Sequence, residues 1–433
     1  MSKHNYNPLI ITALTVAPVV LWYLSPTPTP RFFDTTTTLA NFGQIFGLAG
    51  AALFAINMIL SARLKFFDKI FIGLNHMYVA HKHIGQLALI FLLVHPLLLI
   101  QKYAGGSAAL AFAFLIPGQN WNNNWGIFAL GIMILLIILT LYLRPKYNIW
   151  KITHKFMGLA FFFASLHIYL IPSDVARYLP LRIYMLTLAG LGLITFFYRA
   201  VLGRLLVKRR IYTVSSVKQL NQDVTQIDLK PDGKPILFNA GQFLFTHFID
   251  KNISAEIHPF SFASANTDNG ISIVAKNLGD YTNQLSKLSI GAKAKIEGPY
   301  GAFDFKISKY RKQIWIAGGI GITPFLSMVE SLTPNNDYQI DLYYCVKNKS
   351  EAVGLEKITT RAGILNQKLK IILFCSDDLG FIDSEKIAKM SGGISEREFF
   401  ICAPPAMITA LRKQLTQHGI DKKLIHSEEF NLN

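Results

Sequence analysis

The chain has 433 residues, enough for a membrane-spanning part and a separate globular part. Hydrophobic residues make up 51% of it and charged residues only 16%, a composition that argues against an ordinary soluble protein. The formal net charge of +17 would suit a nucleic-acid-binding protein, but Lys and Arg cluster at the ends of apolar runs, which favours a lipid bilayer as the partner and no nucleic acid.

Six apolar stretches in the first half are long enough to cross a membrane, because a hydrocarbon core of about 30 Å needs about 20 apolar residues per helix. They are residues 9–24, 42–60, 84–101, 125–143, 154–171 and 182–203. The first is followed by a Pro/Thr-rich loop rather than a cleavage site, so we expect it to be retained.

Basic residues concentrate in the loops after the second, fourth and sixth stretches, for example Arg63, Lys151 and Arg209. By the positive-inside rule, both termini and the whole second half are expected on the cytoplasmic side of a bacterial plasma membrane. The third and fifth stretches then both run outward. Trp121 and Trp125 are expected at the outer interface.

Four histidines lie on these two parallel stretches, and ionisable residues inside a bilayer are usually functional. His81 and His95 are fourteen residues apart, and His154 and His167 are thirteen apart. Each pair therefore spans about 20 Å along its helix, with one imidazole near each leaflet. Facing imidazoles at one depth can ligate an iron from both sides, so the pattern predicts two bis-histidine haems and an electron path across the membrane.

The thirteen-residue spacing is the less regular of the two. On an ideal helix fourteen residues return to within about 40° of the starting face, whereas thirteen miss it by about 140°. We therefore expect a local distortion in the fifth stretch, such as a π-bulge, or ligation from different sides.

The second half has a different pattern of hydrophobic residues. Short alternating segments up to about residue 306, such as 271–276, predict a small antiparallel β-barrel. Apolar runs then alternate with helical patterns, which predicts a parallel sheet with crossover helices. Its expected strands are 313–317, 339–346, 369–375 and 399–402. The three cysteines, which lack metal-ligand spacing, suit a reducing compartment.

Motifs in this half suggest cofactor binding. His258-Pro-Phe-Ser261 closes a strand with a turn that can present a hydroxyl and an aromatic edge to a flat ring. Residues 276–282 offer a cation, a flexible turn and a hydroxyl at a helix start, which favours phosphate. In Ala317-Gly-Gly-Ile-Gly-Ile-Thr-Pro324, a glycine-rich turn follows a strand and precedes a helix, so the backbone can approach a diphosphate. Cys402-Ala-Pro-Pro405 ends the last clear strand.

Together with the paired histidines, these motifs resemble the ferric reductase and NADPH oxidase superfamily, across essentially the whole chain. The resemblance implies three domains: a six-helix transmembrane haem domain (1–208), an antiparallel β-barrel FAD domain (209–308) and an α/β parallel-sheet NAD(P) domain (309–433). It also implies two b-type haems, FAD and NADPH or NADH as cofactors.

The residues that the resemblance assigns to these groups fall into four sets. The haem ligands would be His81, His95, His154 and His167. FAD would be bound by His258, Pro259, Phe260, Ser261, Ser264, Lys276, Gly279 and Thr282. The nicotinamide cofactor would be bound by Gly318, Gly319, Gly321, Thr323, Pro324, Cys402 and Pro404. Cys402 would lie near the hydride path, and Phe430 would cover the flavin as the near-terminal aromatic does in the family.

Two positions depart from the family pattern: Ala403 replaces the usual glycine, and three residues follow Phe430. We expect transmembrane electron transfer from NAD(P)H to an outer acceptor, most simply dioxygen. A ferric chelate, a membrane partner or a non-enzymatic haem sensor are the alternatives. Donor and acceptor would be small molecules, with no obligate regulatory protein. Lys347 and Lys349 could meet a 2′-phosphate or lie on an ordinary solvated turn.

Overall fold

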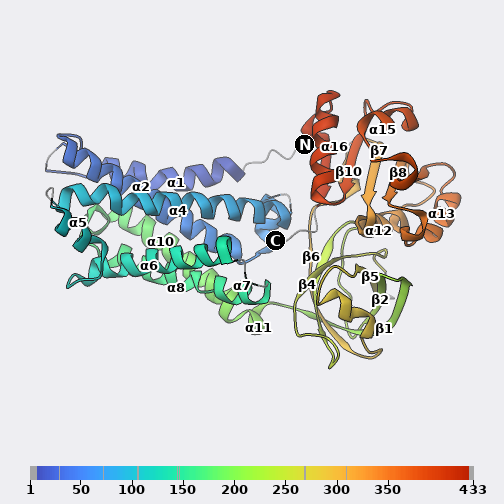
Figure 1. Ribbon diagram of the computed structural model, residues 1–433, viewed down its shortest axis with the longest axis horizontal. Helices are drawn as coiled ribbons and strands as arrows, with labels where there is room; N and C mark the ends of the chain where they lie inside the picture. The colour runs from blue at the N-terminus through green and yellow to red at the C-terminus, as the bar shows by residue number, and fades with distance from the viewer. Residues whose placement is uncertain are drawn as a thin grey trace. The chain divides into compact units, whose positions relative to one another are not determined.

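The computed structural model describes residues 7–428 except 29, 72, 105–106, 144, 146, 268–269 and 309. It divides into two compact units, a helical one up to Val207 and a β-rich one from Lys208, apart from a short segment before His76 that is grouped with the second. Each unit is described by itself (Figure 1).

The helical unit is built around six apolar helices. They are α1 (Asn7–Leu24), α2 (Thr35–Ser61), α4 (Leu74–Ala104), α6 (Trp121–Ile138), α8 (Met157–Leu170) and α10 (Leu179–Phe196). A π-helical turn extends α6 over Leu139–Leu143, and another extends α10 over Phe197–Val201. Short helices lie between them: α3 (Lys65–Ile70), α5 (Ala108–Leu115), α7 (Tyr147–His154), α9 (Asp174–Arg177) and α11 (Gly203–Leu206).

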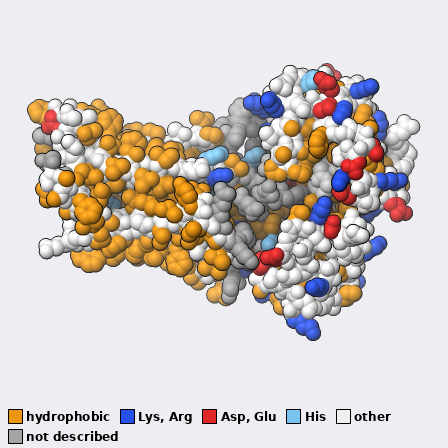
Figure 2. All heavy atoms as spheres, viewed as in Figure 1, with side chains coloured by type: hydrophobic (Ala, Val, Ile, Leu, Met, Phe, Trp, Pro, Cys, Tyr) orange, Lys and Arg blue, Asp and Glu red, His pale blue; other side chains and the backbone are white. Residues whose placement is uncertain are grey.

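Four segments in the described residues are long and apolar enough to cross a membrane: 35–61, 74–102, 121–143 and 179–201. They confirm four of the six predicted spans. The predicted spans 9–24 and 154–171 contain helices α1 and α8, which are not among the four helices long enough to cross a membrane. Apolar side chains cover most of the visible face of this unit, as expected of helices whose solvent is lipid (Figure 2).

Several helix boundaries differ from the expected ones for local reasons. α2 begins seven residues early because Asp34 and Thr37 form a capping box that satisfies the first backbone N–H groups. The fifth span is interrupted at Lys155–Phe156, between α7 and α8. The expected distortion is therefore present, but within the described residues it is a break with tightened turns, and the π-turns lie in α6 and α10 instead.

The first part of the β-rich unit is a six-stranded antiparallel sheet in the order β4-β3-β6-β1-β2-β5. The strands are β1 (Arg210–Asn221), β2 (Val224–Pro231), β3 (Phe243–Ile249), β4 (His258–Ser261), β5 (Ile271–Lys276) and β6 (Lys293–Tyr300). Just beyond β4, the Ala263 N–H donates to Ser272 O at 2.8 Å, which links the two ends of the sheet. The sheet curls around fully buried side chains, among them Tyr212, Phe248 and Phe262.

The second part is a five-stranded parallel sheet in the order β11-β10-β7-β8-β9. Its strands are β7 (Lys312–Gly318), β8 (Gln339–Val346), β9 (Leu369–Cys375), β10 (Glu398–Cys402) and β11 (Ile425–Glu428). The connecting helices are α12 (Thr323–Ser331), α13 (Leu355–Ile364), α14 (Ser376–Leu379), α15 (Ser384–Ser391) and α16 (Pro405–Gln417). Central strands are apolar on both faces because helices cover both, as in Gln313–Gly318, where every residue is buried.

Candidate functional site

His81 of α4 and His154 of α7 lie close together; they form the pair expected near the inner leaflet, called here the inner pair. The ring centroids of His81 and His154 lie 6.3 Å apart with the ring planes at 69°. His81 Nδ1–H donates to Asn57 O of α2 at 3.3 Å, and His154 stacks on Trp150 with centroids 5.0 Å apart. His154 Nδ1 is buried and has no hydrogen-bond partner among the described atoms. Both rings are thus oriented by packing from neighbouring residues.

His95 and His167 form the outer pair, expected near the outer leaflet, and their rings make shorter hydrogen bonds than His81 does. His95 Nδ1–H donates to Gly43 O of α2 at 2.7 Å, and His167 Nδ1–H donates to Asn122 O of α6 at 2.7 Å. The two histidines are close enough to interact electrostatically. Because a backbone carbonyl only accepts, each imidazole carries its proton on Nδ1 and keeps Nε2 as the electron-pair donor. This is the orientation in which a histidine ligates a metal.

These positions fit a haem iron. Metal–imidazole bonds are about 2 Å long and each ring centroid lies about 1 Å behind its nitrogen, so an iron between two imidazoles sets the centroids about 6 Å apart. The 6.3 Å separation of His81 and His154 matches this span. Two other histidines of α4, His76 and His83, are exposed.

Glycines pack against the rings of His95 and His167, where a larger side chain would clash, and the histidine spacing alone does not predict them. A Cβ at Gly47 would lie 2.5 Å from His95 Nδ1, and one at Gly126 would lie 3.1 Å from the His167 ring. Gly43 and Gly47 are spaced as in the small-xxx-small pattern of closely packed membrane helices, and this signal could have identified them. Gly126 offers no comparable signal.

In the β-rich unit, the flavin motif forms strand β4 against β3 in the register Phe243–Ser261. Phe260 and Ser261 are buried. Ser261 Oγ is buried without a hydrogen-bond partner among the described atoms. Buried hydroxyls are normally hydrogen-bonded, so this orphan fits a polar ligand atom such as those of a flavin ring. Ser264 lies at the neighbouring strand, where its Oγ accepts from Ser272 N at 3.0 Å.

His258, at the start of β4, forms a cluster with Tyr281 and Glu256. Its ring stacks on Tyr281 with centroids 3.8 Å apart, and its Nε2 lies 2.7 Å from Glu256 Oε2. Burial, with the Glu256 charge as a smaller cause, raises the pKa of Tyr281. The Tyr281 hydroxyl is thus a neutral donor at neutral pH, and like Ser261 it is buried with no partner among the described atoms.

In the proposed phosphate loop, residues 276–282, the Thr282 hydroxyl makes hydrogen bonds within the loop itself. Thr282 Oγ accepts from the N–H groups of Leu278 and Gly279 at 2.9 and 3.1 Å. The Thr282 hydroxyl therefore holds the turn in shape from within the loop. Gly279 is exposed and a Cβ there would meet nothing within 4 Å, so the loop is open to a ligand, with Lys276 preceding it.

The glycine-rich loop and the Cys402 loop come together at the carboxyl ends of β7 and β10, where Ala317 pairs with Cys402. A Cβ at Gly321 would lie 2.0 Å from Cys402 O, and one at Gly318 would lie 2.8 Å from the Ala403 Cβ. Gly319 has φ +55°, a conformation that side-chain-bearing residues rarely adopt. Gly318 and Gly321 therefore serve close packing of the two loops.

The remaining nicotinamide-site residues lie around this junction. Thr323 begins α12 and donates to Ile320 O at 3.1 Å, and Pro324 follows in the first turn of the helix. Pro404 packs against Gly318. Cys402 is fully buried, and burial, with the Glu428 charge as a smaller cause, raises the pKa of its thiol well above the usual value. Cys402 is therefore a neutral thiol. Phe430 lies outside the described residues.

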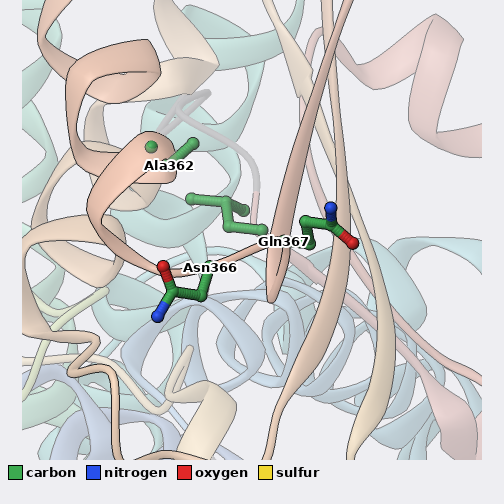
Figure 3. Close-up of a pocket in the computed structure, with 5 residues that line it drawn as sticks. Ala362, Asn366 and Gln367 are labelled. Atoms are coloured by element: carbon green, nitrogen blue, oxygen red, sulfur yellow. The ribbon is translucent and has the colours of Figure 1, made fainter.

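Lys347 and Lys349 follow β8 at the same carboxyl edge and are exposed. A separate hollow of about 460 Å³ lies at the opposite edge, where α13 ends and β9 begins (Figure 3). It is lined by Ala362, Gly363, Asn366, Gln367 and Leu369. In parallel sheets ligands bind beyond the carboxyl ends of the strands, so this hollow is not the nicotinamide site.

Three family models match the chain in succession. A ferric reductase-like transmembrane component matches residues 46–165, an FAD-binding domain 209–304 and an oxidoreductase NAD-binding domain 315–413. The chain belongs to the ferric reductase and NADPH oxidase superfamily. It is an oxidoreductase with FAD- and NAD-binding domains after a membrane-embedded helical region.

Relatives of the reductase half are named as electron transfer components or reductases. The toluate 1,2-dioxygenase electron transfer component of Pseudomonas putida is 24% identical over 229 residues, 50% of this chain and 66% of that protein. The carnitine monooxygenase reductase subunit of Escherichia coli is 27% identical over 225 residues, 50% of this chain and 67% of that protein. A flavohemoglobin structure from Malassezia yamatoensis covers 99% of both chains at 17% identity and a TM-score of 0.50, which concerns fold alone.

Proposed function

We propose that this chain carries electrons from NAD(P)H through FAD and two b-type haems to an acceptor on the outer face of a bacterial plasma membrane, with dioxygen as the acceptor. The observation that carries the proposal is the inner pair, His81 and His154, at the 6.3 Å centroid separation that an iron between two imidazoles requires. Hydrogen bonds from the Nδ1–H groups of His81, His95 and His167 to backbone carbonyls also support it.

At the haems the chain's part is ligation and orientation. His81 and His154 would hold the inner haem, and His95 and His167 the outer one. Two imidazole ligands would leave no open position on the iron, which would suit electron transfer rather than substrate binding at the metal. The cofactors, when bound, supply hydride and single-electron transfer, and the protein supplies position and electrostatics.

At the flavin and nicotinamide the chain would position the two rings. Ser261 and Tyr281 offer buried hydroxyls to the flavin side, with Phe260 and His258 from the same motif. On the nicotinamide side, Gly318, Gly319, Gly321, Thr323 and Pro324 form the phosphate-facing turn, and Cys402 and Pro404 lie beside it. Because Cys402 stays a neutral thiol, it adds no charge to the site.

The proposed topology has six spans, with α1 and the broken α7–α8 segment as the two shorter ones. Both termini and the reductase half would face the cytoplasm, which is supported by the basic loops and by the cytoplasmic location of NAD(P)H. α8 alone has fourteen residues, about 21 Å of helix, so α7 would have to complete the crossing.

An outer ferric chelate is the second candidate acceptor. Arg177 is 71% exposed, although it pairs with Asp174 at 2.6 Å, and could attract an anionic chelate. Arg31, by contrast, is buried and pairs with Asp174 at 3.0 Å, so its role is structural.

The test is an anaerobic absorption spectrum of the purified full chain, supplied with haem and FAD, before and after NADPH. Reduced b-type bands that form with NADPH and disappear in air, with superoxide detected, support the oxidase. Bands that persist in air but bleach with a ferric chelate indicate the reductase, and bands that respond to neither point to a membrane partner. A folded protein with no haem bands refutes the haem proposal and leaves a membrane-bound flavin reductase.

A matched pair of variants tests the inner haem site. His154→Ala should lose the inner haem and stop haem reduction by NADPH while flavin reduction continues. His83→Ala, an exposed histidine on α4, should leave both haems in place. A full haem content in His154→Ala would rule out the assignment.

A further inference from the structure

Helix α12 connects the two cofactor sites of the β-rich unit. Its first residue, Thr323, follows the glycine-rich nicotinamide turn directly. Its penultimate residue, Glu330, reaches the segment that leaves the flavin motif. Glu330 is seven residues after Thr323, so the two lie only about 10 Å apart along the helix.

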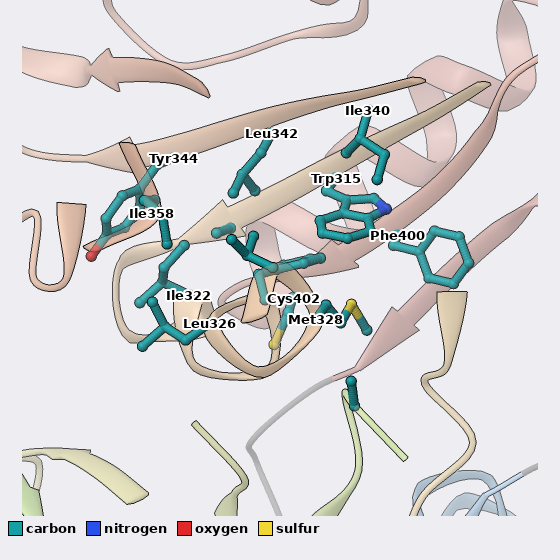
Figure 4. Close-up of a cluster of buried hydrophobic side chains, with 14 of the residues drawn as sticks. Trp315, Ile322, Leu326, Met328, Ile340, Leu342, Tyr344, Ile358, Phe400 and Cys402 are labelled. Carbon is teal, nitrogen blue, oxygen red and sulfur yellow. The ribbon is translucent and has the colours of Figure 1, made fainter. Parts of the chain in front are cut away.

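The middle of α12 is fixed in the shared core of the two sheets. Figure 4 shows Leu326 and Met328 in a buried cluster of hydrophobic side chains. The same cluster includes Ala263, which belongs to the segment after β4. A Cβ at Gly241, in the barrel, would lie 2.4 Å from the Met328 Cε. Close packing of this kind transmits small displacements, because a densely packed core has no empty volume into which a side chain could move. α12 therefore cannot shift without moving the barrel segment against it.

Glu330 adds a hydrogen bond to this apolar contact. Its Oε2 accepts from the Ala265 N–H at 2.6 Å, and its Oε1 pairs with Lys357 of α13. Ala265 is four residues beyond Ser261 of the flavin motif. A carboxylate that accepts from a backbone N–H forms a short, charge-assisted bond with a defined direction. The side chain is 22% exposed, so the bond is partly shielded from water.

We propose that Glu330 is a positioning residue for hydride transfer: it fixes the flavin strand β4 relative to the nicotinamide turn by clamping Ala265 to the end of α12. This rests on the proposed NAD(P)H-to-FAD step. That step moves one proton and two electrons from the nicotinamide, which is oxidised, to the flavin, which is reduced. It requires reacting atoms about 3–3.5 Å apart, and a 1 Å misplacement can cost about 100-fold in rate.

The experiment is stopped-flow reduction of the flavin by NADPH and by 4-deuterated NADPH, under anaerobic conditions, in the FAD-loaded full chain. Glu330→Ala should slow flavin reduction at saturating NADPH by about tenfold or more and raise the deuterium isotope effect, because hydride transfer becomes slower than the steps around it. FAD content and NADP⁺ affinity should stay within about twofold. Lys357→Met, which leaves the Ala265 bond intact, should have a smaller effect.

Asp337→Ala is the matched control, because it removes an exposed carboxylate that pairs with Arg311 at 3.2 Å within the nicotinamide domain alone. It should reduce flavin at the wild-type rate. If Glu330→Ala does not yield FAD-loaded protein, Glu330→Gln, which keeps the shape and loses the charge, is measured the same way and should show a smaller slowing in the same direction.

Wild-type rates and isotope effects in both Glu330 variants overturn the proposal. Loss of NADP⁺ affinity with an unchanged limiting rate also overturns it, since Glu330 would then act on binding rather than on geometry. If the wild-type flavin is reduced by dithionite but by neither NADPH nor NADH, the proposed function itself fails, and this outcome is separate from either result with Glu330.

Discussion

Gly321→Ala should disable the nicotinamide site through a clash that can be sized from the structure. The new Cβ would lie 2.0 Å from Cys402 O, whereas real Cβ contacts essentially never fall below 3.0 Å. The glycine-rich turn and the Cys402 loop must therefore separate by about 1 Å. Since both loops would face the nicotinamide in the proposed site, a displacement of this size should lower the rate of flavin reduction by about 100-fold. Stopped-flow reduction of the FAD-loaded chain by NADPH measures it.

Gly363→Ala is the control for this prediction. Gly363 lies in α13, outside the glycine-rich turn and the Cys402 loop, and a Cβ there meets nothing within 4 Å. It should leave the limiting rate at the wild-type value. Equal rates for Gly321→Ala and wild type, with FAD bound in both, would refute the reasoning that the two loops share one site.

Three further predictions concern the other sites. Gly47→Ala should displace His95 and lower the content of the outer haem, whereas Gly131→Ala, which meets nothing within 4 Å, should retain it; quantification of haem per chain distinguishes the two. Ser261→Ala should weaken FAD binding by about 1 kcal/mol, or about fivefold in Kd, if its orphan hydroxyl bonds the flavin; an unchanged Kd by fluorescence titration would show that it does not. Burial raises the pKa of Cys345 from its ordinary 9.0 to about 12, so the folded chain keeps a proton that the unfolded chain releases above pH 9. Stability should therefore fall by about 1.4 kcal/mol per pH unit from this thiol as pH rises from 9 towards 12, and the Tm of Cys345→Ala should fall less steeply over that range.

Elements with a strong local signal could be predicted from the sequence. The predicted strands 339–346 and 369–375 match β8 and β9 residue for residue, because apolar runs between turn residues define their own ends. α2 was predicted to begin at residue 42, since apolar length alone does not see the capping box at Asp34 and Thr37. The 276–282 turn was expected to offer a cation, a flexible turn and a hydroxyl to phosphate, and the bonds of the Thr282 hydroxyl to two N–H groups of the turn could not be predicted.

Partners from other helices could not be predicted. The carbonyls of Gly43 and Asn122 that orient the outer histidines belong to α2 and α6, far from them in sequence. A backbone carbonyl has no residue-type signature, so only the packed structure identifies it. The same holds for Glu330, whose partner is the N–H of Ala265. The histidines themselves were identifiable because a polar side chain in a bilayer has few structural reasons to be there.

The break in the fifth span accounts for most of the histidine misalignment that an ideal helix would impose. Between His154 and His167, the N–H groups of Lys155, Phe156, Gly158 and Leu159 donate to carbonyls three residues back rather than four. A turn of this kind advances about 120° per residue instead of about 100°, so four such residues add about 80°. The shortfall of about 140° then falls to about 60°, comparable with the roughly 40° between His81 and His95 on α4. A thirteen-residue spacing on a locally tightened helix can therefore serve as a near equivalent of fourteen on a regular one, and the break at Lys155–Phe156 is what allows α7 and α8 to contribute to both pairs.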